Sequence, residues 1–222
     1  MSRSTRAVLF FNFLAISILW ILCVKCVDVY AIGPDCTEVG FSSLNQGFRN
    51  LFDYGELGYS PFWYNVTKII GYISILICVF WGCVGNYQMI KEKSFNAIDK
   101  SIIATGILYV LTIALYIFFE VCIINCRPVI MPGETVPEAS FPSSHTMLAI
   151  VSFGSMIFLV GYFLEGKRYK TIVRAVRIIC IFLMVLMVAG RLVSGVHWLT
   201  DIIGGVLISG TLLSLYSVFA DV

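Results

Sequence analysis

The residues best suited to chemistry in this chain are its two histidines, each beside polar or charged residues at the end of an apolar stretch. His145 ends the run Pro142-Ser143-Ser144-His145. His197 follows Arg191 by six residues and precedes Asp201 by four, and Arg127-Pro128 lies upstream of both. Ionisable residues are costly inside a membrane and usually have a function there. These residues are therefore the candidate site.

The spacing of His197 and Asp201 suits a nucleophile held by a carboxylate. If a helix begins at His197, the two side chains share a face and the carboxylate accepts a hydrogen bond from one ring nitrogen. The other ring nitrogen then stays basic, and Asp201 stabilises the positive charge that develops on the ring. The alternative is a histidine that caps a helix at the membrane interface, and the pair alone does not decide between them.

Arg127 and Arg191 suggest a multiply charged anion, since each guanidinium can donate a fork of hydrogen bonds to phosphate oxygens. The alternative for either arginine is snorkelling to lipid headgroups. The run before His145 predicts a helix start, with Ser143 capping amides that also point toward a bound anion. His145 is then placed as a general acid. For the serines alone, a simple polar cap remains the alternative.

The elements that position these residues are predicted to be membrane helices. Of 222 residues, 59% are hydrophobic and 13% are charged, in long apolar blocks. Since about 20 apolar residues span a bilayer as a helix, we expect an all-α polytopic protein with one domain, residues 1–222. The predicted helices cover residues 7–27, 66–90, 101–124, 145–164, 172–192 and 198–220. The first could be a signal peptide, but it is too long and has no clear cleavage site.

Lysine and arginine predict the orientation, because short loops rich in them stay on the cytoplasmic side. Such residues precede the first helix and fill the turns after the second and fourth helices; they are Arg3, Arg6, Lys91, Lys93, Lys100, Lys167, Arg168, Lys170 and Arg174. We therefore expect both termini in the cytoplasm and a site that faces outward across the cell membrane.

Two features of the outer side leave alternatives open. Residues 28–65 are rich in aromatic side chains, which favour the headgroup region. They predict an interfacial hairpin or short helix that anchors the fold, or else a gate or surface for a lipid substrate. Cys36 and Cys126 are both predicted to lie outside and could form a disulfide. The cysteine spacing gives no metal-binding signature.

Three segments together resemble the signature motifs of the type 2 phosphatidic acid phosphatase superfamily. They are Arg127-Pro128, residues 142–145, and Arg191 followed by His197 and Asp201 at the spacing given above. Their order and spacing match, and they lie within residues 120–201. The six-helix layout also looks like that of the integral membrane lipid phosphatases of this superfamily.

The resemblance implies a mechanism without a metal ion or other cofactor. His197 would attack phosphorus to give a phosphohistidine, Asp201 would orient it, and His145 would protonate the leaving oxygen and then activate water. The phosphoryl oxygens would be bound by Arg127, Arg191 and Ser143, with Ser144 beside them. Transition-state charge would be met by arginines and backbone amides.

The partners implied are a lipid phosphate substrate and membrane lipids, with no nucleic acid and no obligatory protein partner. The resemblance favours undecaprenyl pyrophosphate, followed by phosphatidic acid or phosphatidylglycerol phosphate. A lipid phosphotransferase would use the same residues with a different acceptor. A catalytically altered lipid-binding protein is the third reading, against which the complete set of His145, His197 and Asp201 argues.

The chain departs from the family pattern at three positions. Glu120 stands where the first motif has a lysine, seven residues before Arg127; along a continuous helix this is two turns, so both should face the same way. Glu120 either pairs with Arg127, reads a cationic or hydroxylated headgroup, or marks a position that tolerates loss of the lysine. Ser144 replaces a frequent glycine and Gly190 replaces a serine.

Overall fold

The computed structural model describes residues 2–164 and 166–220, and in this part of the chain six long helices form a bundle. All six are long and apolar enough to cross a membrane, so the predicted number and order of spans are confirmed. They are α1 (Arg3–Cys26), α3 (Pro61–Glu92), α4 (Lys100–Val121), α5 (Ser144–Phe163), α6 (Lys170–Ser194) and α7 (Leu199–Phe219).

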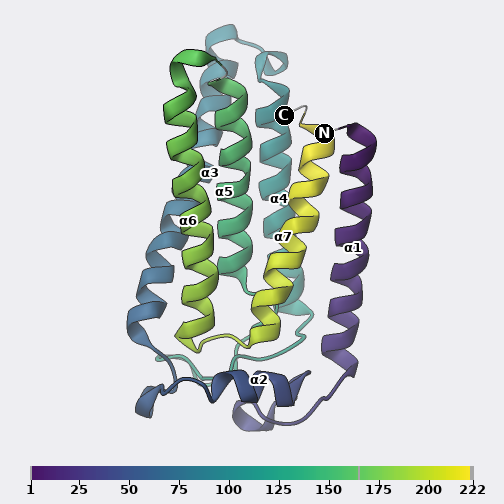
Figure 1. Cartoon of the computed structure of the whole chain (residues 1–222), viewed down its shortest axis with the longest axis vertical. Coiled ribbons are helices and arrows are strands. Elements are labelled where there is room, and N and C mark those ends of the chain that lie inside the picture. Colours follow the sequence, from purple (N-terminus) through teal and green to yellow (C-terminus); the bar gives the residue numbers. More distant parts are fainter. Residues whose placement is uncertain (1, 165, 221–222) are drawn as a thin grey trace.

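Helix α5 is the most enclosed of the six and forms the centre of the bundle (Figure 1). It packs against α3, α4, α6 and α7, while α1 lies along α7 at one edge. Met147, Val151, Phe153 and Leu159 of α5 are all at most 1% exposed. Many apolar side chains of α1 and α6 face outward instead, as expected where lipid is the solvent. The helix that carries His145 is therefore the rigid centre of the fold.

Residues 28–65, called the outer segment after their predicted location, contain a short helix, α2 (Ser42–Arg49). This helix lies across the end of the bundle opposite the two termini (Figure 1). Asn45 of α2 is buried, and its side-chain amide donates to the Thr200 hydroxyl of α7 at 3.0 Å and accepts from the Thr200 backbone N–H at 3.2 Å. Of the forms considered for this segment, the structure thus contains a short helix, and that helix is hydrogen-bonded to the start of α7.

The turn between α6 and α7 is held by the same outer segment. Gly195 ends α6 with a φ of +76°, a conformation that side chains disfavour. A Cβ atom at this position would lie 2.6 Å from the Tyr54 ring, so the contact also requires glycine. The Arg49 guanidinium donates to the Gly195 carbonyl at 2.7 Å and lies over the Tyr54 ring. The outer segment thus fixes the chain just before His197.

The two ends of the bundle differ in character. Both termini and the turns between α3 and α4 and between α5 and α6 lie at one end, which carries most of the lysines and arginines (Figure 1). The loops that bear the predicted site lie at the other end. Cys36 and Cys126 both have free thiols, so the disulfide considered from the sequence is not formed.

Candidate active site

Arg127 reaches the site from a loop and not from a helix. Helix α4 ends at Val121, so the expectation that Glu120 and Arg127 are related by two helical turns is wrong. The Arg127 backbone N–H donates to the Glu138 carbonyl at 2.9 Å, and the two side chains form an ion pair at 3.3 Å. Glu120 is exposed, yet it lines the same narrow hollow as Arg127 and His197. The loop after α4 therefore places Arg127 beside the same hollow as Glu120, although the two residues do not share a helix face.

Ser143 is at the start of α5 as predicted, but its side chain does not cap the helix. The Ser143 hydroxyl, fully buried, accepts a hydrogen bond from the Thr146 hydroxyl at 3.0 Å. Its backbone N–H donates to the Asp201 carbonyl at 3.0 Å, which ties the start of α5 to the start of α7. Ser144 is less buried and lines the hollow. In this structure Ser144 is therefore the better placed of the two to meet a ligand.

His197 and Asp201 are close, but not in the way the spacing suggested. Helix α7 begins at Leu199, so His197 precedes the helix and the shared-face argument is wrong. The distance from His197 Nδ1 to Asp201 Oδ2 is 3.8 Å, too long for a hydrogen bond. The Ser140 hydroxyl lies between them, 3.0 Å from Nδ1 and 2.5 Å from Oδ2.

Asp201 is completely buried and its carboxylate is well supplied with donors. It accepts from the Asn125 amide at 3.1 Å, from the Trp198 backbone N–H at 2.9 Å and from the Ser140 hydroxyl. A buried carboxylate needs such partners, because an isolated one costs many kcal/mol. Asp201 thereby joins α7 to the loop between α4 and α5.

His197 presents a free nitrogen to the hollow. Its Nδ1 lies 3.1 Å from the Ser140 carbonyl oxygen, which can only accept, so Nδ1 carries the proton. The opposite nitrogen, Nε2, is buried and has no hydrogen-bond partner among the described residues. Burial, with Arg191 and Arg127 nearby, holds the pKa of His197 well below its usual 6.5. The ring is therefore neutral at physiological pH, with a lone pair on Nε2.

Arg191 is the most unusual group in the structure. Its side chain is fully buried, and none of its three guanidinium nitrogens has a hydrogen-bond partner among residues 2–164 and 166–220. The Tyr64 ring, whose centroid lies 5.4 Å away, gives partial compensation. An unpaired buried cation costs several kcal/mol. Such a cost is expected where an anionic ligand completes the site.

His145 lies where the hollow meets a groove between α3, α4 and α5. This groove has a volume of about 280 Å³, and most of its lining is apolar. It shares Tyr116, Ser144 and Met147 with the hollow, so the two spaces adjoin. Its rim includes Tyr72 and other exposed side chains on the lipid-facing surface. A ligand in the groove would have its polar end beside His145.

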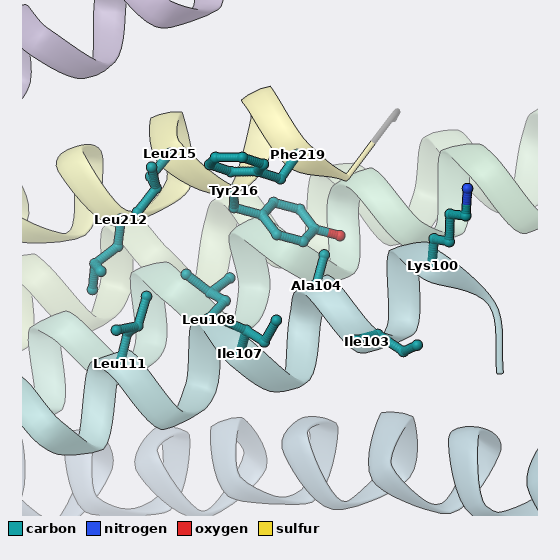
Figure 2. Close-up of a pocket in the computed structure, with 10 residues that line it drawn as sticks. All are labelled: Lys100, Ile103, Ala104, Ile107, Leu108, Leu111, Leu212, Leu215, Tyr216 and Phe219. Carbon is teal, nitrogen blue, oxygen red and sulfur yellow. The ribbon is translucent and has the colours of Figure 1, made fainter. Parts of the chain in front are cut away.

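A second groove is unconnected with these residues. It lies between α4 and α7 near the end of the bundle that carries the termini, with a volume of about 380 Å³ (Figure 2). Lys100 is the one charged residue in its lining, and the other side chains are apolar or aromatic. None of the motif residues lines it.

The structure thus brings together His145, His197, Asp201, Arg127 and Arg191, as the sequence predicted. Four residues near them were missed: Ser140, Asn125, Glu138 and Lys68, the last of which lines the groove beside His145. The first three lie in the polar loop before α5 and carry no spacing signal. Lys68 is a charge within a long apolar helix, a signal that could have been read.

In the described part of the chain, no group of three or more His, Cys, Asp or Glu residues could hold a metal ion.

Comparison with known proteins identifies the family. The model of the PAP2 superfamily matches residues 76–221, which include all the motif residues. This chain belongs to the PAP2 superfamily. A crystal structure described as the first transmembrane PAP2 type phosphatidylglycerolphosphate phosphatase from Bacillus subtilis has the same fold, with a TM-score of 0.58. It is 19% identical to this chain, and the match covers 97% of this chain and 96% of the other. No curated protein sequence matches this PAP2 chain.

The resemblance seen in the motifs is therefore confirmed. With six helices able to span a membrane, the protein is a multi-pass membrane protein of the PAP2 superfamily.

Proposed function

We propose that the protein hydrolyses a phosphate or pyrophosphate ester of a membrane lipid through a phosphohistidine on His197, without a metal ion. The main support for this proposal is that one buried site contains both the Arg191 guanidinium and His197 Nε2, and neither has a hydrogen-bond partner among the described residues. A cation with unused donors requires an anion, and a basic nitrogen beside it supplies a nucleophile.

The phosphoryl group is held by arginines. Arg191 has all its donors free, and Arg127 is oriented by its ion pair with Glu138. Ser144 and the first amides of α5 add neutral donors at the same place. Because the site is largely closed to water, these donors act in a low dielectric and stabilise the charge of the transition state strongly.

The reaction proceeds in two steps. His197 Nε2 attacks phosphorus, the bond from phosphorus to the lipid oxygen breaks, and His145 gives that oxygen a proton. Water then attacks phosphorus, the bond from phosphorus to Nε2 breaks, and His145 takes a proton from the water. Inorganic phosphate leaves, and both histidines return to their starting states.

The groove beside His145 supports a lipid as the substrate. Its walls are mostly apolar, it opens on the lipid-facing surface, and it adjoins the hollow that contains His197. A hydrocarbon tail can lie in the groove while the phosphate remains at the arginines. Lys68, on the groove wall, suits the additional negative charge of a pyrophosphate. We place this end of the bundle at the outer face of the membrane, because the opposite end is rich in lysine and arginine.

Undecaprenyl pyrophosphate is our first candidate substrate. Its extended chain suits an open lateral groove, and its pyrophosphate suits the two arginines and Lys68. Phosphatidylglycerol phosphate is the second candidate, because the structural neighbour from Bacillus subtilis is described as a phosphatase for that lipid. Phosphatidic acid follows.

The experiment is phosphate release by purified protein in detergent with a chelator present, over these three lipids. We expect release that survives chelation, is lost in His197→Ala and falls severalfold in Lys68→Ala, most clearly with the pyrophosphate. Ser152→Ala is the matched control, since Ser152 is buried in α5 and bonds only within that helix. Loss of release on chelation, or full release by His197→Ala, would contradict the proposal.

Two further outcomes separate the alternatives. Transfer of the phosphate to an added alcohol in preference to water would identify a phosphotransferase. No release by folded protein from any of the lipids would favour a lipid-binding protein.

A further inference from the structure

We propose that Ser140 is a positioning residue that connects Asp201 to His197 through its hydroxyl group, in a chain from His197 Nδ1–H to Ser140 Oγ and from Ser140 Oγ–H to Asp201. The proposal rests on the proposed function, in which His197 is the nucleophile. It assigns a role to a residue outside the three motifs.

The direction of each hydrogen bond follows from what each atom can donate. The Ser140 carbonyl oxygen, 3.1 Å from His197 Nδ1, can only accept, so Nδ1 bears the hydrogen. Asp201 Oδ2, 2.5 Å from Ser140 Oγ, is a carboxylate oxygen, so the hydroxyl donates its single proton there. The remaining lone pairs of Oγ face Nδ1–H at 3.0 Å. The Nδ1–H is thus shared between two acceptors of Ser140, its carbonyl oxygen and its hydroxyl oxygen, and the hydroxyl proton goes to Asp201.

The histidine and the carboxylate form no direct hydrogen bond. Nδ1 and Oδ2 are 3.8 Å apart, and Oδ2 already accepts from the Trp198 backbone N–H. Asp201 is 0% exposed and Ser140 is 3% exposed, so water has little access to take the place of the hydroxyl. The backbone carbonyl of Ser140 orients the ring, but it carries no net charge. The hydroxyl links the Asp201 carboxylate to the ring by hydrogen bonds, in addition to the attraction that the carboxylate exerts through space on the imidazolium that forms during attack.

The position of Ser140 is itself fixed by the fold. Its backbone N–H donates to the Asn125 carbonyl at 2.9 Å, and the Asn125 side-chain amide donates to the other carboxylate oxygen of Asp201. Residues on both sides of the loop between α4 and α5 therefore hold the serine against α7. A hydroxyl placed in this way needs no reorganisation when the ring becomes charged.

A double-mutant cycle tests the connection. Phosphate release is measured for the full-length protein, Ser140→Ala, Asp201→Asn and the double variant, with Ser152→Ala as the buried-serine control. We expect Ser140→Ala to lower kcat about 10- to 100-fold with KM nearly unchanged, as for loss of a hydrogen bond to a charged group. In the Asp201→Asn background the same change should have less than a threefold effect, because the hydroxyl then no longer bonds to a charged carboxylate.

Each other result of the cycle overturns the proposal. Equal effects of Ser140→Ala in both backgrounds would show that the serine acts independently of Asp201. A Ser140→Ala variant as active as the parent would show that His197 and Asp201 can pair directly. Phosphate release by the parent protein and by His197→Ala tests the proposed function separately. If the parent releases no phosphate, the proposed function is wrong, and the role of Ser140 is then tested by the NMR measurement described next.

Nitrogen NMR on histidine-labelled protein tests the chain without catalysis. The protein has two histidines, so His145→Ala leaves a single imidazole to observe. We expect its Nδ1 to show the protonated signature at neutral pH and its Nε2 the unprotonated one, with the Nδ1 signal shifting in Ser140→Ala. A protonated Nε2, or an Nδ1 signal indifferent to Ser140→Ala, would overturn the proposal. This reading stands even if a variant loses thermal stability.

Discussion

Replacing Arg191 by methionine should stabilise the ligand-free protein while destroying its affinity for phosphate. The Arg191 side chain is fully buried and its three nitrogens have no partner among the described residues. Burying an ion without a partner costs several kcal/mol even after relaxation. The contact with the Tyr64 ring returns about 1–2 kcal/mol of this. Methionine fills much of the same volume with no charge to desolvate.

The net expectation is a gain of about 1–3 kcal/mol in the free energy of unfolding of Arg191→Met. For a chain of this size about 1 kcal/mol corresponds to a shift of roughly 2–4 °C in melting temperature. Arg191→Met should therefore melt about 2–12 °C above the parent when no anion is present. Arg191→Lys should not, because it keeps the buried charge.

The assay is thermal unfolding in detergent with and without inorganic phosphate. At a concentration near 100 times the dissociation constant, phosphate should stabilise the parent by about 2.7 kcal/mol and leave Arg191→Met unaffected. Phosphate should thus narrow the gap between the two melting temperatures, and should reverse their order if the gain from Arg191→Met is below about 2.7 kcal/mol. A variant that melts below the parent without phosphate, or that phosphate stabilises equally, would refute the reasoning that Arg191 is an unsatisfied anion ligand.

Three further predictions concern neighbouring positions. The pKa of His197 lies well below 6.5 in the folded protein, so below pH 6.5 the unfolded chain binds a proton at this residue and the folded chain does not. The free energy of unfolding should therefore fall by about 1.4 kcal/mol for each pH unit below 6.5. His197→Gln should remove this part of the dependence of melting temperature on pH. A Cβ on Gly190 would lie 2.6 Å from Thr67 Cγ2, so Gly190→Ser should cost about 1–3 kcal/mol, and adding Thr67→Ser should restore the melting temperature; no rescue would place the strain elsewhere. Glu120→Lys should lower KM for a lipid phosphate roughly fivefold, since it adds about 1 kcal/mol of attraction at a partly solvated site, and an unchanged ranking of headgroups would argue against recognition by Glu120.

The sequence was most informative where long-range packing mattered least. Six apolar blocks near 20 residues dictate six spans, because unsatisfied backbone groups are too costly in lipid. The sequence also indicated which residues would meet at one end of the bundle, since charges and histidines at the ends of apolar segments have few other uses.

Local geometry at the helix ends could not be predicted in the same way. The spacing of His197 and Asp201 suggested a helical pair, but α7 starts after Trp198, whose backbone N–H is capped by Asp201. Likewise α4 ends at Val121, which places Arg127 in a loop. Sequence periodicity cannot tell where the last turn of a helix stops when a polar loop folds back over it.

Ser140 and Asn125 were beyond the reach of the sequence for a different reason. Serine and asparagine are ordinary residues in a loop, and neither has a characteristic spacing to Asp201. Their importance comes from contacts over 61 and 76 positions in the chain. Such contacts become visible only once the loop between α4 and α5 is placed against the start of α7.

The most direct test of the account is to trap the phosphorylated enzyme. Full-length protein is mixed with a radiolabelled lipid pyrophosphate or phosphate in the presence of a chelator, quenched rapidly, and digested to locate the label. We expect a label on the peptide containing His197, stable to base, labile to acid and absent from His197→Ala. Phosphate release without any label on the protein, or a label that persists in His197→Ala, would contradict it.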